Sequence, residues 1–227
     1  KSDVEEYMRR YITRQNMVIS IAGDITADEV TQIVDEYFAA LGNDYQPDVT
    51  LQKIQIPAQT DTKIIEHDIP QSMIAFGLQG LQRSDPDYIP AYIVNYMVGG
   101  SGLNSHLAKE LRVKRGLIYS VRSRLDPKNY AAAWRGSFST KNKTANEALN
   151  VLTETLRSFA GDGIDEQALA DAKSYLTGSF VLGLSKNQDV AHFMTVMQLY
   201  DLGIDYLDKR NGLINAVTIE DANRVLR

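Results

Sequence analysis

Residues 111–121 place the strongest constraint on the fold, because an amphipathic helical pattern, a glycine and a strand pattern follow one another without a gap. The run reads Leu111-Arg112-Val113-Lys114-Arg115-Gly116-Leu117-Ile118-Tyr119-Ser120-Val121. It puts the guanidinium of Arg112 and the phenol of Tyr119 on opposite sides of the glycine break. Arginine offers a fixed fork of charged N–H donors, and tyrosine offers one polarised O–H. Directed into a shared space, these groups could hold a peptide carbonyl or an oxyanion that forms from it.

Composition excludes several classes of protein. The 227 residues suffice for one large domain, or for one domain and part of another. The net charge is −5 and there is no basic run, so we expect no nucleic-acid partner. No apolar run reaches the roughly 18 residues of a membrane span. Cysteine is absent, which removes disulfides, thiolate metal sites and cysteine nucleophiles. Because the chain begins with Lys1 and shows no signal peptide, we interpret it as an excised part of a longer protein.

The first third of the chain predicts a helix, a strand and a second helix. Residues 3–14 have helical apolar spacing, and residues 16–23 form an apolar run that predicts a strand. Thr26 and Glu29 have the spacing of a capping box, which opens a helix to about Leu41.

A polar stretch with several prolines, residues 43–61, then predicts a flexible linker, with a long surface loop as the alternative. Beyond it we expect strands at 62–69, 72–80, 117–125 and 129–139, helices at 84–97 and 103–113, and four helices to the end. Residues 126–129 read as a hairpin connection between the last two strands. The order of these elements predicts an α+β fold, with an antiparallel or mixed sheet and helices packed on one face.

Other kinds of chemistry have weaker support. The three histidines, His67, His106 and His192, lack the spacing of helical metal ligands, and neither H-E-x-x-H nor H-x-x-E-H occurs. We therefore predict no metal site in this chain. The run 99–102 could form a nucleophile elbow or a phosphate cradle, but a tight turn between two helices is favoured. Arg112 and Tyr119 also have purely structural interpretations. Arg112 could form an ion pair with an acid such as Glu110, and Tyr119 could pack in the core.

Residues 98–121 resemble the second-half signature of the pitrilysin/insulinase superfamily of zinc metallopeptidases, L-R-x-x-x-G-L-x-Y-x-V after a glycine-rich turn and a small polar residue. The matching residues are Gly99, Gly100, Ser101, Gly102, Ser105, Leu107, Leu111, Arg112, Arg115, Gly116, Leu117, Tyr119 and Val121. The resemblance extends over nearly the whole chain at lower specificity.

The resemblance implies paired α+β domains that enclose a chamber. Tyr119 would hydrogen-bond the scissile carbonyl oxygen, Arg112 would hold a substrate backbone carbonyl, and Gly99, Gly100 and Ser101 would contact substrate. It implies that zinc lies in a homologous partner domain or subunit, and that this chain has no activity alone. The expected organisation is the tail of a preceding homologous unit at 1–42, a linker at 43–61, and a C-terminal domain at 62–227 that lacks its last strand and helix.

The resemblance leaves two functions open. The chain is either the metal-free half of a zinc metalloendopeptidase that binds peptide, or a catalytically inactive homologue that acts as a structural or partner subunit. Bacterial relatives of this kind are often periplasmic. By analogy, we expect a periplasmic location for this protein if its source is bacterial.

Overall fold

The computed structural model describes residues 1–43, 45, 50–57 and 61–227. The chain divides into two compact units, a smaller one of Lys1–Gln52 and Ser179–Asp208 and a larger one of Lys53–Gly178 and Lys209–Arg227. Within the predicted linker, residues 44, 46–49 and 58–60 lie outside the described residues.

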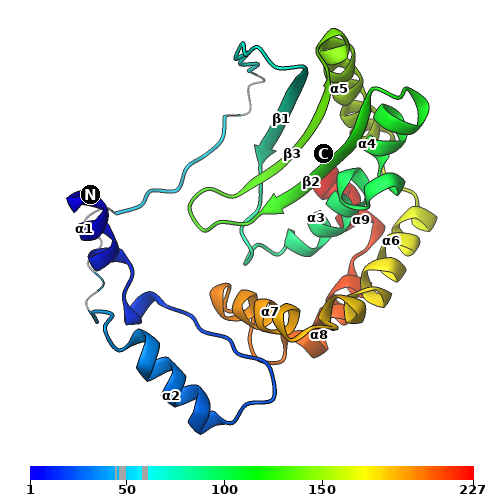
Figure 1. The fold of residues 1–227 in the computed structure, drawn as a ribbon. Coiled ribbons are helices and arrows are strands. Elements are labelled where there is room, and N and C mark those ends of the chain that lie inside the picture. Colours follow the sequence, from blue (N-terminus) through cyan, green and yellow to red (C-terminus); the bar gives the residue numbers. More distant parts are fainter. Residues whose placement is uncertain (44, 46–49, 58–60) are drawn as a thin grey trace. The chain divides into compact units, whose positions relative to one another are not determined.

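The larger unit contains a three-stranded antiparallel sheet, in which β3 lies between β1 and β2 (Figure 1). The strands are β1 (Gln71–Gln79), β2 (Ile118–Asp126) and β3 (Ala133–Lys141). β2 and β3 form a hairpin, which confirms the connection predicted at 126–129, and β1 pairs with β3 from a distant part of the sequence. Three of the predicted strands are thereby confirmed, although β3 begins later than expected.

Aromatic packing fixes the register of β1 against β3 on the buried face. The Phe76 ring lies opposite Gly136 and packs beside Trp134 and Phe138, with ring centroids 5.5 and 6.3 Å away. A side chain on residue 136 would collide with that ring, since a Cβ there would lie 2.3 Å from it. Glycine therefore leaves the space that Phe76 fills.

Helices α3 (Tyr88–Asn95), α4 (His106–Ala108) and α5 (Ala145–Asp162) pack against this buried face. Helices α6 (Glu166–Gly178), α8 (Tyr206–Ala216) and α9 (Ile219–Leu226) contribute residues to the same core. The shared core contains the fully buried side chains of Ile93, Leu107 and Leu111. The arrangement confirms the predicted α+β fold with helices on one face of an antiparallel sheet.

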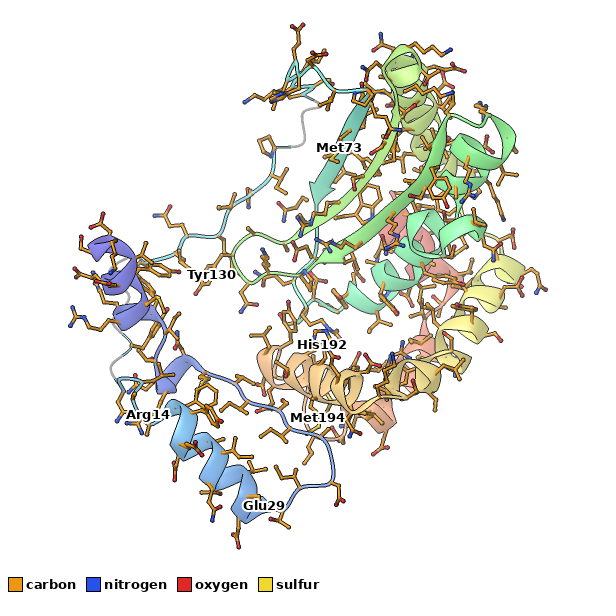
Figure 2. The ribbon with its side chains drawn as sticks, in the orientation of Figure 1. Arg14, Glu29, Met73, Tyr130, His192 and Met194 are labelled. Carbon is orange, nitrogen blue, oxygen red and sulfur yellow. The ribbon has the colours of Figure 1, made fainter. Side chains whose placement is uncertain are left out.

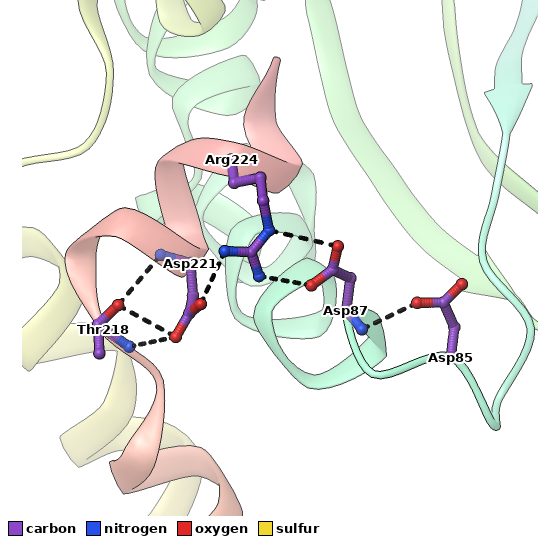
Figure 3. Close-up of polar contacts among 5 residues, drawn as sticks. All are labelled: Asp85, Asp87, Thr218, Asp221 and Arg224. Atoms are coloured by element: carbon purple, nitrogen blue, oxygen red, sulfur yellow. Dashed lines mark hydrogen bonds and ion pairs between the residues drawn. The ribbon is translucent and has the colours of Figure 1, made fainter.

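A polar network ties α9 to the start of α3 (Figure 3). The Arg224 guanidinium donates to Asp87 at 2.6 Å and to Asp221 at 2.8 Å. Thr218 caps α9 by accepting from the Asp221 backbone N–H at 3.1 Å. The hydrogen bond from the Thr218 backbone, with that from Arg224, lowers the pKa of Asp221. The chain end at α9 is thus fastened to α3 by charge as well as by the core.

The smaller unit contains α1 (Ser2–Tyr11), α2 (Ala27–Phe38) and α7 (Asn187–Leu199). α2 begins with the predicted capping box, in which the Glu29 backbone donates to Thr26 and the Glu29 carboxylate accepts in return. Glu29 is labelled at this end of α2 in Figure 2. α7 contacts the segment before α2 through the Gln198 amide, which donates to Ser20 Oγ at 2.8 Å. Residues distant in sequence therefore share this unit.

Three expectations about secondary structure are wrong. The stretch 16–23 begins in a 3₁₀ turn (Arg14–Asn16) and forms no strand, and residues 62–69 also form none. Both stretches contain β-branched residues typical of strands, but no neighbouring strand pairs with them within the described residues. The third concerns the stretch from 145 onward, where five α-helices stand in place of the four expected, and a 3₁₀ segment (Phe180–Leu184) lies between α6 and α7.

Candidate functional site

The predicted helix–glycine–strand junction is present, and a wide helical turn leads into it. Lys109–Lys114 forms a π-helix, a geometry that often marks functional sites. Gly116 has φ of +62°, and its N–H donates to the Arg112 carbonyl at 2.9 Å. The Leu117 N–H donates to the carbonyl of the buried Leu111, also at 2.9 Å. These bonds end the helix with a left-handed glycine cap and lock the start of β2 in place.

A β-bulge in β2 directs Tyr119 outward. Ile118 pairs with Thr140 and Val121 pairs with Phe138, so two residues of β2 oppose one residue of β3. Ile118 and Val121 are both buried, and Tyr119 is 81% exposed. Alternation counted back from Val121 would have buried Tyr119. The alternative in which Tyr119 packs in the core is therefore wrong.

Arg112 lies over the ring of Tyr119, with its guanidinium carbon 4.9 Å from the ring centroid. This distance is that of a cation–π contact, which needs none of the guanidinium N–H groups as a hydrogen-bond donor to the ring plane. Glu110, the acid considered as a partner of Arg112, instead pairs with Lys114 and Arg115, each at 2.5 Å. Hydrogen bonds from Lys114 and then Arg115 lower the pKa of Glu110. The alternative pair between Arg112 and Glu110 is wrong.

The donors of this pair are unoccupied within the part of the chain that the structure describes. No carboxylate there pairs with Arg112, and no protein group there accepts from the Tyr119 hydroxyl. The arrangement therefore offers a phenolic O–H and a guanidinium fork side by side on an exposed surface. Both groups can donate to carbonyl oxygens of an extended peptide.

Gly99, Gly100 and Ser101 lie at the end of a second π-helix (Tyr96–Gly100) that packs behind β2. Gly99 is buried against Ser123, and Gly100 is exposed. Gly102, with φ of +62°, follows at the start of a 3₁₀ turn. This geometry supports the tight turn, while the contact of residues 99–101 with substrate stays a prediction.

Sequence reasoning missed the polar residues that hold this turn to the sheet. Asn95 Oδ1 accepts from the Ser123 hydroxyl and from Trp134 Nε1, both at 2.8 Å. The three residues come from α3, β2 and β3, and no spacing in the sequence relates them. The network fixes the glycine turn relative to the strand that carries Tyr119.

The described residues do not fit a zinc site. Among residues 1–43, 45, 50–57 and 61–227, no three histidine, cysteine or acidic side chains form a group that could hold a metal ion. His106 instead packs against Phe159, with the two rings tilted and their centroids 4.3 Å apart. Burial lowers the pKa of His106, with Lys109 as the next cause. None of the helices in the described ranges is long and apolar enough to cross a membrane.

The fold is a helix-backed α+β domain that carries an exposed arginine–tyrosine pair. Residues 1–176 match the family described as the peptidase M16 inactive domain, and the chain belongs to that family. This assignment confirms the resemblance drawn from residues 98–121.

Individual relatives agree with the family. The chain is 31% identical to an uncharacterized zinc protease of Mycobacterium leprae, over 96% of this chain and 49% of that protein. It is 23% identical to a non-peptidase homolog of Helicobacter pylori, over 95% of this chain and 49% of the other. A crystal structure of a peptidase M16 inactive domain from Pseudomonas fluorescens is 27% identical with a TM-score of 0.71, covering 90% of this chain and 48% of that one. The chain spans about half the length of the curated relatives it matches.

Proposed function

We propose that this chain is the metal-free C-terminal half of a pitrilysin-type zinc metalloendopeptidase, and that it completes an active site with a zinc-bearing domain or subunit. The observation that carries the proposal is the Arg112–Tyr119 pair. Its donors are exposed and unoccupied within the described residues, on a junction held by a glycine cap and a bulge. We further propose that residues 1–42 continue a preceding homologous unit and that 43–61 link it to the domain at 62–227.

In this proposal the pair acts on the peptide backbone. The Tyr119 O–H donates to the oxygen of the scissile carbonyl, and this bond strengthens as negative charge develops on that oxygen. Arg112 donates to a neighbouring backbone carbonyl and holds the peptide in register. Zinc, supplied by the other half, would activate the attacking water. Because the donors stand ready before substrate arrives, little reorganisation opposes the reaction.

The test is a mixing assay. This half is combined with its zinc-bearing partner to form the complete enzyme, and cleavage of a quenched fluorescent peptide is measured. Tyr119→Phe should lower kcat by about 100- to 1,000-fold with little change in KM, because the lost bond forms mainly in the transition state. Arg112→Ala should raise KM as well. Tyr130→Phe is the matched control, because Tyr130 is also an exposed tyrosine but lies near the hairpin tip (Figure 2). Equal turnover of Tyr119→Phe and the unaltered enzyme would remove Tyr119 from the site.

A catalytically inactive homologue that serves as a structural or partner subunit is the second candidate function. Two observations favour it: the family is described as an inactive domain, and one relative is named a non-peptidase homolog. The two candidates differ in what must accompany the chain. An H-x-x-E-H motif in the same protein or in a partner subunit supports the peptidase, and a stable complex that binds zinc without cleaving peptide supports the structural subunit.

A further inference from the structure

Two arginines stand on the exposed face of β2, beyond the bulge. Arg122 and Arg124 alternate with the buried Val121 and Ser123, so both point away from the helices. The exposed face of the sheet is thus positively charged along β2, although the whole chain carries a net charge of −5.

These arginines are not balanced by acids. Arg135 of β3 pairs with Asp126 at 2.7 Å, whereas no carboxylate in the described residues pairs with Arg122 or Arg124. Arg124 also lies directly opposite Arg135 in the sheet register. Like charges in directly opposed positions weaken a sheet. Asp126 offsets the charge of Arg135, so Arg122 and Arg124 are the charges on β2 that a bound anionic group can neutralise.

The neighbouring strands leave room for an extended segment on this face. Across the sheet from Arg122 lie Ser137 of β3 and Ala75 of β1, both with short side chains. Met73 (Figure 2) lies two residues before Ala75 on β1, on the same face, and is 77% exposed. A peptide can therefore lie over short side chains with its own side chains within reach of the arginines.

We infer that this exposed face binds acidic side chains of an extended peptide, so that the completed enzyme prefers substrates rich in aspartate or glutamate near the scissile bond. The inference rests on the proposed function, because the same peptide is held at Tyr119. At about 3.4 Å per residue, Arg122 and Arg124 lie roughly 10 and 17 Å along the strand from Tyr119. The acidic side chains should therefore stand about three to five positions from the scissile bond. Arginine forms paired N–H···O bonds with a carboxylate, which suits it to this selection.

The experiment compares two peptides that share a scissile sequence and differ only in glutamate or glutamine at those positions. With the complete enzyme, we expect kcat/KM to be about fivefold higher for the glutamate peptide, as suits exposed charge pairs. An Arg122→Gln/Arg124→Gln variant should lose this preference and retain its activity on the glutamine peptide. Arg157→Gln removes an exposed arginine on α5, which packs against the opposite face of the sheet, and should keep the preference. Raising the ionic strength from about 0.01 M to about 1 M should reduce the preference in the unaltered enzyme.

Two results would overturn the inference: equal kcat/KM for the two peptides, or a preference that survives in the double variant. If the unaltered complex cleaves neither peptide, the proposed function fails. The acid-selective face is then tested separately, by measuring how tightly the two peptides bind. Fluorescence anisotropy with labelled peptides should then show tighter binding of the glutamate peptide, and loss of that advantage in the double variant. Equal binding of both peptides would exclude an acid-selective face.

Discussion

Replacing Gly99 with alanine should destabilise the larger unit, because the backbone of the second π-helix leaves no room for a methyl group there. A Cβ at this position would lie 2.4 Å from the hydroxyl oxygen of Ser123 and 2.9 Å from its Cβ. Unstrained carbon contacts lie about 3.5–4.0 Å apart, so Ser123 would have to move by about 1 Å. That shift would break its 2.8 Å hydrogen bond to Asn95.

The size of the effect follows from three contributions. Overpacking of a tight site costs about 1–3 kcal/mol. The lost hydrogen bond adds about 1 kcal/mol. The better helix propensity of alanine over glycine offsets about 1 kcal/mol. We therefore expect the free energy of unfolding to fall by about 2 kcal/mol.

Urea unfolding followed by tryptophan fluorescence measures this directly. Trp134 is the only tryptophan in the sequence, and its indole N–H donates to the same Asn95 oxygen that Ser123 contacts. The variant should show a lower midpoint and a shifted emission in the folded state. Gly212→Ala is the control, because Gly212 lies inside α8 with no heavy atom within 4 Å of the added Cβ. Gly212→Ala should keep the emission and, through the better helix propensity of alanine, should not lower the midpoint. If Gly99→Ala also keeps the midpoint and emission of the unaltered chain, the reasoning about the turn is refuted.

Three further predictions concern the same domain. Leu111→Ala should lower the free energy of unfolding by about 2–5 kcal/mol in urea titrations, because Leu111 is fully buried; a loss below 1 kcal/mol would mean that the π-helix collapses into the cavity. Gly116→Ala should cost about 1–2 kcal/mol in the same titrations, because residue 116 has φ of +62°, and Gly116→Asn should cost less. The lowered pKa of His106 means that the unfolded chain binds more protons near its ordinary pKa of about 6.5. The free energy of unfolding should therefore fall as the pH drops from about 7.5 to about 5. A His106→Gln variant should lose the part of this pH dependence that His106 contributes. Identical pH profiles for the two proteins would contradict the lowered pKa of His106.

Much of the fold was predictable because its signals are local. The capping box at Thr26 and Glu29 specifies a helix start through neighbouring residues alone. Gly116 specifies a helix end in the same way, and the alternation in β1 reports the buried face directly. The two stretches wrongly expected to be strands show the limit of such signals. Strand-like composition favours extended backbone, but a strand also needs a partner, which depends on residues distant in sequence.

The sequence names the residues of the candidate site, whose role stays a prediction, but it does not encode their geometry. Arg112 and Tyr119 were identified from a short motif, but their mutual contact depends on the bulge and the π-helix. Each of these adds one residue to a regular pattern, which no local propensity encodes. The network of Asn95, Ser123 and Trp134 lacked any sequence signal, since it joins three elements through side chains of common types.

The bulge has a second consequence, for association between molecules. β2 is an outer strand of the sheet, and an outer strand presents free N–H and C=O groups that can pair with another chain. The extra residue at Tyr119 and Ser120 interrupts that row, so a straight strand cannot add along its full length. The irregularity that exposes the tyrosine thus also protects this border of the sheet from edge-to-edge aggregation.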